Sequence, residues 1–273
     1  MLYIGVDLGT SAVKLLLMDE EGKIRNIVSK EYPLFFPHPG WSEQRPQDWF
    51  EQSMEGIREL TAECDKEEVA GISFGGQMHG LVALDKDDNV IRPAILWNDG
   101  RTGEETDYLN QTIGKERLSA YTANIAFAGF TAPKILWMKK HEPENFWENQ
   151  QNHASQGLSG LQAVRLFLHG CIRRVRDAAD GCKEQMLVRG NAGYLRHYRS
   201  TAAYAARKLR SGGHAETRDC RRLGLPKSVK VIAGAGDNAA AAVGTGTVGE
   251  GRCNISLGTS GTHLHLQQEI RLG

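Results

Sequence analysis

Apolar residues along the chain fall into short runs and one long amphipathic stretch, which together predict an α/β fold. Residues 2–9 (LYIGVDLG) have the composition of a buried strand ending in a glycine turn, and residues 12–32 continue as two strands around Glu21–Gly22. In residues 46–63 the apolar side chains recur at helical spacing, and Pro46 suits a first helical turn. The pattern therefore predicts a three-stranded β-meander followed by a helix.

Five further segments carry comparable patterns. They predict, in chain order, a glycine-broken strand at 69–76, a hairpin at 81–97, a helix at 131–143, a strand, glycine-rich turn and small-residue helix at 228–246, and a strand ending in a glycine turn at 251–262. We expect the hairpin to turn at Asp88–Asn89 and Thr131 to cap its helix.

Charge is distributed unevenly, although the formal net charge of the chain is zero. Residues 147–222 hold 14 of the 33 Lys and Arg residues but only 6 of the 33 Asp and Glu residues. The same segment has no proline and contains three of the five cysteines. A break in composition this sharp is typical of a domain boundary, a tail or a foreign segment.

Composition also narrows the cellular setting. The sequence contains no run of 18 apolar residues, so it predicts no membrane span. The N-terminus lacks the pattern of a signal peptide. Five cysteines without a CxxC pair favour a reducing cytoplasm. The basic segment lacks interleaved aromatic residues and any recognisable nucleic-acid motif, so we expect no nucleic-acid partner.

Two glycine turns with the same sequence, Gly-Thr-Ser, are the first candidates for functional sites. Asp7, Gly9, Thr10 and Ser11 end an apolar strand, where backbone amides and hydroxyls could cradle a phosphate and a carboxylate could hold hydrated Mg²⁺. An ordinary glycine turn with an aspartate cap explains this copy equally well. A second copy near the other end of the chain, at Gly258–Gly261, favours a clamp on the two ends of a polyphosphate.

Asp237 lies in the string GAGDNAAAAVG, where a substrate can come close to the backbone. A carboxylate there could accept the proton of a substrate hydroxyl during phosphoryl transfer. The alternative is that Asp237 caps the helix of small residues, and both roles can hold together.

Two loops have the chemistry of a sugar site. Gln77, Met78 and His79 lie between glycines after a strand, and residues 95–102 (ILWNDGRT) bring together an aromatic ring, an amide, a carboxylate and a guanidinium. Sugars are bound by such mixtures of aromatic faces and planar hydrogen-bonding groups. A salt-bridged turn would explain Asp99 and its neighbouring arginine equally well.

Taken together, these strings resemble the FGGY family of carbohydrate kinases over residues 1–146 and about 223–262. The strings DLGTSAVK, PGWSEQRP, GQMHG, RPAILWNDGR, GFTAPKILWMKKHEPENF, AGAGDNAAAAVG and SLGTSG occur in the order and spacing of the family. The resemblance implies an actin-like, RNase H-like α/β kinase of two domains, with a sugar and Mg-ATP in the cleft between them. Within the family it is closest to members that phosphorylate D-xylulose, and it implies a homodimer for the intact enzyme.

The resemblance also implies roles for individual residues. Asp237 would be the general base, and Asp7 and Asp237 would organise Mg²⁺. The sugar would be contacted by Gln77, Met78, His79, Trp97, Asp99 and Asn238. The phosphates of ATP would be bound by Gly9, Thr10, Ser11, Lys14, Gly258, Thr259 and Ser260.

The chain departs from the family in residues 147–222 and after Thr262. One allowed coding of His169 to Asp177 gives the family-like string TDVSDASGM when it is read one base later. We therefore expect residues 147–222 to be an out-of-frame, poorly ordered segment. Residues 1–146 and 223–250 would form the N-terminal sugar-binding domain.

Residues 251–273 would be the truncated start of the C-terminal nucleotide-binding domain, most of which would be missing. We accordingly expect no useful kinase activity from the chain as written. The rival hypotheses are a kinase of another ketose or polyol, a non-catalytic sugar-binding remnant, a chaperone-like nucleotide binder, and a product that does not fold.

Overall fold

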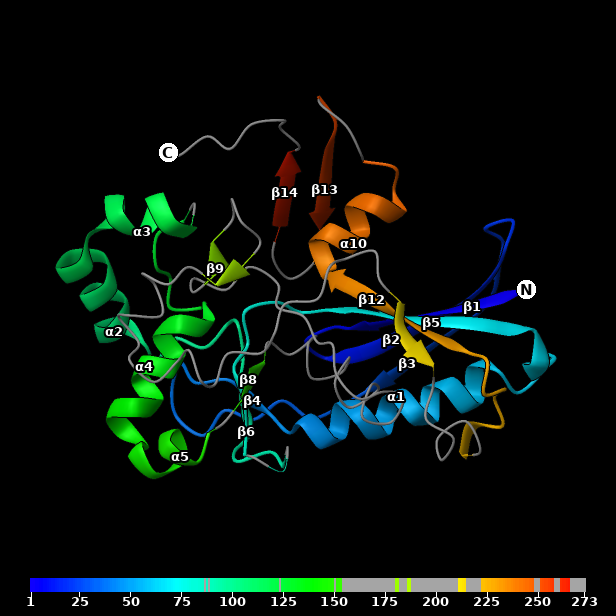
Figure 1. Ribbon diagram of the computed structural model, residues 1–273, viewed down its shortest axis with the longest axis horizontal. Helices are drawn as coiled ribbons and strands as arrows, with labels where there is room; N and C mark the ends of the chain where they lie inside the picture. The colour runs from blue at the N-terminus through cyan, green and yellow to red at the C-terminus, as the bar shows by residue number, and fades with distance from the viewer. Residues whose placement is uncertain are drawn as a thin grey trace.

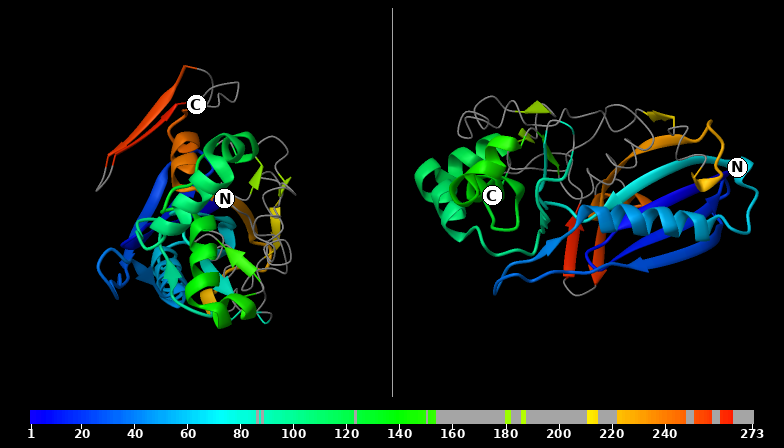
Figure 2. Two further views of the ribbon diagram at one scale, coloured as in Figure 1. Left: turned by 90° about the vertical axis from the view of Figure 1, so that its left-hand side faces the viewer. Right: turned by 90° about the horizontal axis from the view of Figure 1, so that it is seen from below.

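A computed structural model gives the structure of the protein (Figures 1 and 2). It describes residues 1–85, 87, 89–122, 124–149, 151–153, 180–181, 186–187, 211–214, 222–247, 251–257 and 261–265. Most of the predicted out-of-frame segment, and residues 258–260 of the second glycine turn, lie outside the described residues. The predicted domain boundaries therefore stay predictions.

A six-stranded sheet forms the larger part of the described fold. Its strands, in spatial order, are β11 (Ser211–His214), β12 (Lys230–Gly236), β5 (Val69–Gly76), β1 (Leu2–Leu8), β2 (Ala12–Asp19) and β3 (Ile24–Glu31). Strands β12, β5 and β1 are parallel, whereas β2, β3 and β11 each pair antiparallel with a neighbour. The β-meander predicted for the first three strands is confirmed.

One face of the sheet is covered by α1 (Pro46–Leu60), which runs along β2 and β3 (Figure 1). The helix begins at Pro46, as predicted, because proline needs no hydrogen-bonding partner for its nitrogen in the first turn. Trp49, Met54, Ile57 and Leu60 are buried along one stripe and join the core formed by the alternating apolar residues of the strands.

A second group of helices lies beyond the carboxyl ends of the parallel strands, at the left in Figure 1. Its elements are α2 (Gly103–Asp107), the π-helical segment η2 (Tyr108–Gly114), α3 (Lys115–Thr122), α4 (Thr131–His141) and α5 (Pro143–Glu148). A separate apolar cluster around Ile95, Ile135 and Met138 joins α4 to the strands beneath it. None of the helices in the described part of the chain is long and apolar enough to cross a bilayer.

Several short elements connect these parts. They are β4 (Glu43–Gln44), the 3-10 turn η1 (Lys66–Glu68), β6 (Val82–Leu84), β7 (Ala94–Ile95), β8 (Gln151–His153), β9 (Asp180–Gly181) and β10 (Met186–Leu187). The predicted hairpin at 81–97 is reduced to isolated antiparallel bridges, Leu84 with Val90 and Leu81 with Ile95.

The end of the described chain repeats the arrangement seen at its beginning. Helix α10 (Asp237–Gly244) follows β12 directly, and β13 (Cys253–Leu257) pairs antiparallel with β14 (Gly261–His265). The first glycine turn likewise separates the antiparallel strands β1 and β2. Strand β14 was not predicted, because the sequence pattern assigned residues 261 and 262 to the glycine turn.

Two predicted caps are wrong. Helix α4 begins at Thr131 with Phe130 as its N-cap residue, and the Thr131 hydroxyl instead donates to the carbonyl oxygen of His79 (3.2 Å). Asp237 is the first helical residue of α10 rather than its cap, because the extended residue before the helix is Gly236. There is also no separate glycine-rich turn, since β12 continues to Gly236.

The buried stripe of α1 predicts a large difference between neighbouring substitutions. Ile57→Ala should lower the free energy of unfolding by about 2–5 kcal/mol, because it removes buried methyl groups and leaves a cavity. Arg58→Ala, on the exposed face of the same turn, should change it by less than about 0.5 kcal/mol. Urea unfolding measures both, and equal losses would contradict the predicted packing.

Candidate active site

The site begins with the parallel strands, whose carboxyl ends meet at one edge of the sheet. Strand β5 lies between β1 and β12, with Asp7 opposite Gly75 and Gly236 opposite Gly76. Asp7 on β1 and Asp237 directly after β12 therefore flank the terminal glycines of β5. Residues 230 positions apart in the sequence are brought together in this way.

The two carboxylates influence each other. Both side chains reach solvent, yet surrounding protein atoms displace part of their water and raise the pKa of each carboxyl. Lys14, opposite Asp7 across β1 and β2, partly lowers the pKa of Asp7. The backbone N–H of Asn238 donates to Asp237 Oδ1 (2.7 Å) and lowers the pKa of Asp237, whereas the negative charge of Asp7 raises it.

This pair fits the predicted magnesium site. Mg²⁺ keeps most of its water and is usually held by one or two carboxylates together with substrate phosphates. Among the described residues no group of three or more His, Cys, Asp or Glu side chains could hold a metal without other ligands. That Asp7 and Asp237 hold a hydrated Mg²⁺ together with a phosphate therefore stays a prediction.

The first glycine turn is held by side chains from four separate segments. The Tyr32 hydroxyl donates to the carbonyl oxygen of Gly9, and Trp97 Nε1 donates to Thr10 Oγ1 (3.0 Å). Gln44 Nε2 donates to the carbonyl oxygen of Thr10 (2.7 Å), and Gln77 Nε2 makes a longer contact with that of Gly9 (3.4 Å). Within the turn, the backbone N–H of Gly9 also donates to the carbonyl oxygen of Ala12 (3.0 Å).

Gln44 is the residue that sequence reasoning missed. Its side chain is 1% exposed, and Gln44 Oε1 accepts from Trp49 Nε1 (3.0 Å) and from Gln77 Nε2 (3.2 Å). Gln44 therefore links α1, the glycine turn and the loop after β5. It lies in the family-like string PGWSEQRP, but nothing in the polarity pattern distinguishes it from an exposed glutamine.

The predicted sugar residues after β5 differ in accessibility. Gln77 is buried and bonded to Gln44, so its geometry favours a structural contact over a direct sugar contact. Met78 and His79 are half-buried. His79 has a left-handed backbone conformation, with φ of 66°, which costs a non-glycine residue about 1–3 kcal/mol. Its imidazole stacks on Phe130, with 4.5 Å between the ring centroids.

The second predicted sugar loop exposes its tryptophan and buries its aspartate. Trp97 is 39% exposed. Asp99 is buried and bidentate with Arg101, with its Oδ1 2.9 Å from Arg101 Nε and its Oδ2 2.8 Å from Arg101 Nη2. Asp99 Oδ2 also accepts from the Ser42 amide (2.6 Å). This geometry does not favour a sugar contact for Asp99, and the alternative salt-bridged turn is the arrangement present.

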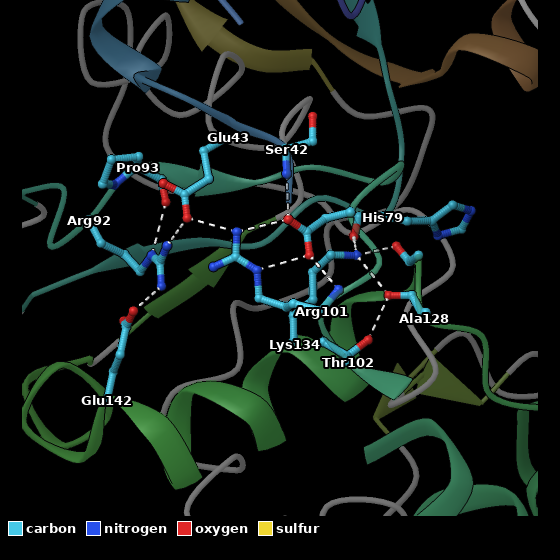
Figure 3. A network of polar contacts seen from close by, with 12 residues as sticks. Ser42, Glu43, His79, Arg92, Pro93, Arg101, Thr102, Ala128, Lys134 and Glu142 are labelled. Carbon is cyan, nitrogen blue, oxygen red and sulfur yellow. Dashed lines mark hydrogen bonds and ion pairs between the residues drawn. The ribbon is translucent and has the colours of Figure 1, made fainter. Parts of the chain in front are cut away.

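The Asp99–Arg101 pair extends into a buried polar network. Arg101 Nη2 also bonds Glu43 Oε1 (2.8 Å), and Arg92 joins Glu43 to Glu142 (Figure 3). The guanidinium of Arg101 lies close to two tryptophan rings, 3.8 Å from the centroid of Trp41 and 4.8 Å from that of Trp137. The network fastens the Trp97 loop to β4 and to the second helix group.

The strand arrangement thus brings Asp7, Lys14, Asp237 and Asn238 to one edge of the sheet, beside the first glycine turn. Trp97 is joined to that turn directly through Thr10. The second glycine turn is the remaining predicted part, and it lies outside the described residues.

The chain is similar to known proteins over most of its length. The model of the N-terminal domain of the FGGY family of carbohydrate kinases matches residues 2–154, more than half of the chain. The chain belongs to the FGGY family of carbohydrate kinases. The matched region of this FGGY chain ends close to position 147, where the composition of the sequence changes.

Named relatives of this FGGY chain are sugar kinases. The xylulose kinase of Bacillus subtilis is 37% identical over 97% of this chain, and that of Escherichia coli is 34% identical over 98%. A crystal structure of a xylulose ("xyloylose") kinase from Brucella ovis is 33% identical, with a TM-score of 0.87 over 96% of this chain. The chain spans about half the length of these relatives, 54% in each case. The predicted actin-like α/β sugar-kinase fold is confirmed.

Removing the Gln44 amide should destabilise the protein. Gln44→Leu leaves the Trp49 indole N–H and the carbonyl oxygen of Thr10 without these partners, and each lost buried partner costs about 1–3 kcal/mol. Urea unfolding measures the loss. Gln47→Leu, the same change at an exposed position of α1, is the control and should have little effect. A loss no greater than that of the control would contradict the role of Gln44.

Removing the charge of Asp237 should stabilise the folded protein at neutral pH. A raised pKa means that the folded state holds the proton more tightly than the unfolded state, so ionisation costs stability as the pH rises. Asp237→Asn should therefore raise the Tm at pH 7, and the gain should disappear as the pH falls below the ordinary Asp pKa. Asp107→Asn, at an exposed position, is the control. A Tm gain that is independent of pH would contradict this explanation.

Proposed function

We propose that this chain carries the sugar-binding side of an enzyme that transfers the γ-phosphate of ATP to D-xylulose and forms D-xylulose 5-phosphate. The observation that carries the proposal is the pair of carboxylates, Asp7 and Asp237, at the sheet edge that also bears the first glycine turn. Phosphoryl transfer needs a base for the attacking hydroxyl beside a site for metal and phosphate. The relatives named xylulose kinase indicate which sugar to test first.

Asp237 is the proposed general base. Its raised pKa brings the carboxylate nearer to a useful basicity than an ordinary surface aspartate has. It would accept the hydroxyl proton as the sugar oxygen bonds to the γ-phosphorus and the bond to the leaving ADP oxygen breaks. The backbone N–H of Asn238 donates the 2.7 Å hydrogen bond that orients the Asp237 carboxylate.

The phosphate side would be formed by Gly9, Thr10, Ser11 and Lys14, with Gly258, Thr259 and Ser260 as the second turn. Lys14 lies opposite Asp7 across two strands, so its charge can attract the phosphate while Asp7 holds the ion. When bound, Mg²⁺ supplies positive charge that stabilises the phosphoryl oxygens, and Asp7 and Asp237 would hold it.

The sugar side would be formed by Met78, His79, Trp97 and Asn238. Trp97 is partly exposed, and its indole N–H donates to Thr10 Oγ1. This hydrogen bond would link the sugar part of the site to the phosphate part. Gln77 and Asp99 would contribute indirectly, by stabilising the two loops that carry the proposed sugar contacts.

Other sugar kinases share the fold. A gluconate kinase from Lactobacillus acidophilus has a TM-score of 0.88 at 24% identity, and a glycerol kinase from Plasmodium falciparum has 0.83 at 17%. These likenesses show the fold alone, so gluconate and glycerol are the competitors in a binding test. A cytoplasmic location, where ATP is abundant, and a homodimeric intact enzyme are further parts of the proposal.

The test is binding of D-xylulose to the full chain, measured by isothermal titration calorimetry. We expect D-xylulose to bind at least about tenfold more tightly than gluconate or glycerol, a difference of about 1.4 kcal/mol. His79→Gln should weaken binding of D-xylulose, because it alters a group proposed to contact the sugar.

The matched control is His38→Gln, since His38 packs on Trp41 and lies outside the proposed site. Equal binding of the three ligands, or equal effects of the two histidine substitutions, would contradict the proposed sugar site.

A further inference from the structure

The strained backbone of His79 is held from one side by the first turn of helix α4. His79 is the only non-glycine residue with positive φ within the described ranges. Its carbonyl oxygen accepts from two α4 side chains, Thr131 Oγ1 (3.2 Å) and Lys134 Nζ (3.3 Å). A left-handed conformation persists only where surrounding contacts over-determine it, and these two donors supply such contacts.

Lys134 is the less expected of the two donors, because its side chain is fully buried. Its ammonium group lies among main-chain carbonyl oxygens, shown in Figure 3. Besides His79, these oxygens belong to Ala128 (3.4 Å), Gly129 and Phe130 (3.3 Å), which precede α4. Burying an ammonium is costly unless its donors are satisfied, so this group of carbonyls must stay close to Lys134.

The same turn is tied to the second sugar loop. A side chain on Gly129 would lie 2.4 Å from the carbonyl oxygen of Trp97, so only glycine allows this close approach. Thr102 Oγ1 also donates to the Ala128 carbonyl oxygen (3.0 Å). Lys134 therefore lies where the His79 loop, the Ala128–Phe130 turn and the Trp97 loop meet.

We propose that Thr131 and Lys134 are positioning residues that hold His79 in its left-handed conformation and thereby set the affinity of the site for the sugar. The inference rests on the proposed function for its sugar-binding part. Neither residue touches the sugar in this account. They act through the His79 carbonyl, which fixes the direction of the imidazole and of the neighbouring Met78.

The first readout is the backbone conformation of His79, which does not depend on any ligand. The full chain is labelled with ¹³C and ¹⁵N histidine, and of its nine histidines the His79 signal is the one that His79→Gln removes. The Cα and Cβ chemical shifts distinguish left-handed from extended backbone. We expect left-handed shifts in the wild type and their loss in Thr131→Val, which keeps the side-chain shape but removes the donor.

Two further variants separate positioning from general stability. Thr131→Ser restores the hydroxyl and should recover the left-handed shifts. Lys134→Met should lose them, whereas Lys140→Met, the same change at an exposed position of α4, should keep them. If Lys134→Met does not fold, Thr131→Val and Thr131→Ser still decide the question.

The second readout is D-xylulose affinity. If only about a tenth of the molecules keep His79 in the binding conformation, the dissociation constant should rise about tenfold in Thr131→Val and return towards wild type in Thr131→Ser.

Left-handed shifts that persist in the folded Thr131→Val and Lys134→Met variants would overturn the inference. Lost shifts with unchanged sugar affinity would overturn its sugar-binding part. A wild type that does not bind D-xylulose would instead count against the proposed function, and the chemical shifts would still decide whether these residues position His79.

Discussion

The parallel pairing of β1, β5 and β12 is the constraint on which the rest of the structure depends. It places the ends of three strands at one edge, so Asp7, the loop bearing His79, and Asp237 become neighbours although the chain separates them widely. Hydrogen bonds of the strand backbones fix this register, and the carboxylates then influence each other electrostatically. The proposed base, the proposed metal ligands and the first glycine turn all lie at this edge.

Side-chain amides and buried charged groups hold the loops around this edge of the sheet in place. Gln44 joins the first glycine turn to α1 and to the loop after β5, while Arg101 fastens the Trp97 loop through Asp99. Lys134 does the same for the loop of His79 through main-chain oxygens. Buried polar groups of this kind require nearly complete hydrogen bonding, so they hold loops in one arrangement more strictly than apolar contacts do.

Much of the fold could be predicted from the sequence because its signals are local. Alternating and helical apolar patterns predicted the first three strands and the start of α1 at Pro46, although the helix ends at Leu60, three residues before the predicted end. Three details were not predictable, because they depend on partners distant in sequence. They are the buried amide of Gln44, the choice of Phe130 over Thr131 as a cap, and the burial of Asp99, for which the sequence left two alternatives open. For Asp237 the local signal was misleading. The sequence allowed it to be the helix cap, but β12 extends to Gly236 and Asp237 is the first helical residue.

The most direct test of the account is a crystal structure of the chain soaked or co-crystallised with D-xylulose, in which the position of the sugar relative to Asp237 is measured. The account predicts a sugar hydroxyl within about 2.6–3.2 Å of the Asp237 carboxylate, the reach of a general base, with His79 and Trp97 alongside the sugar. A sugar bound elsewhere, or bound there with Asp237 beyond reach of every hydroxyl even through one water, would contradict it.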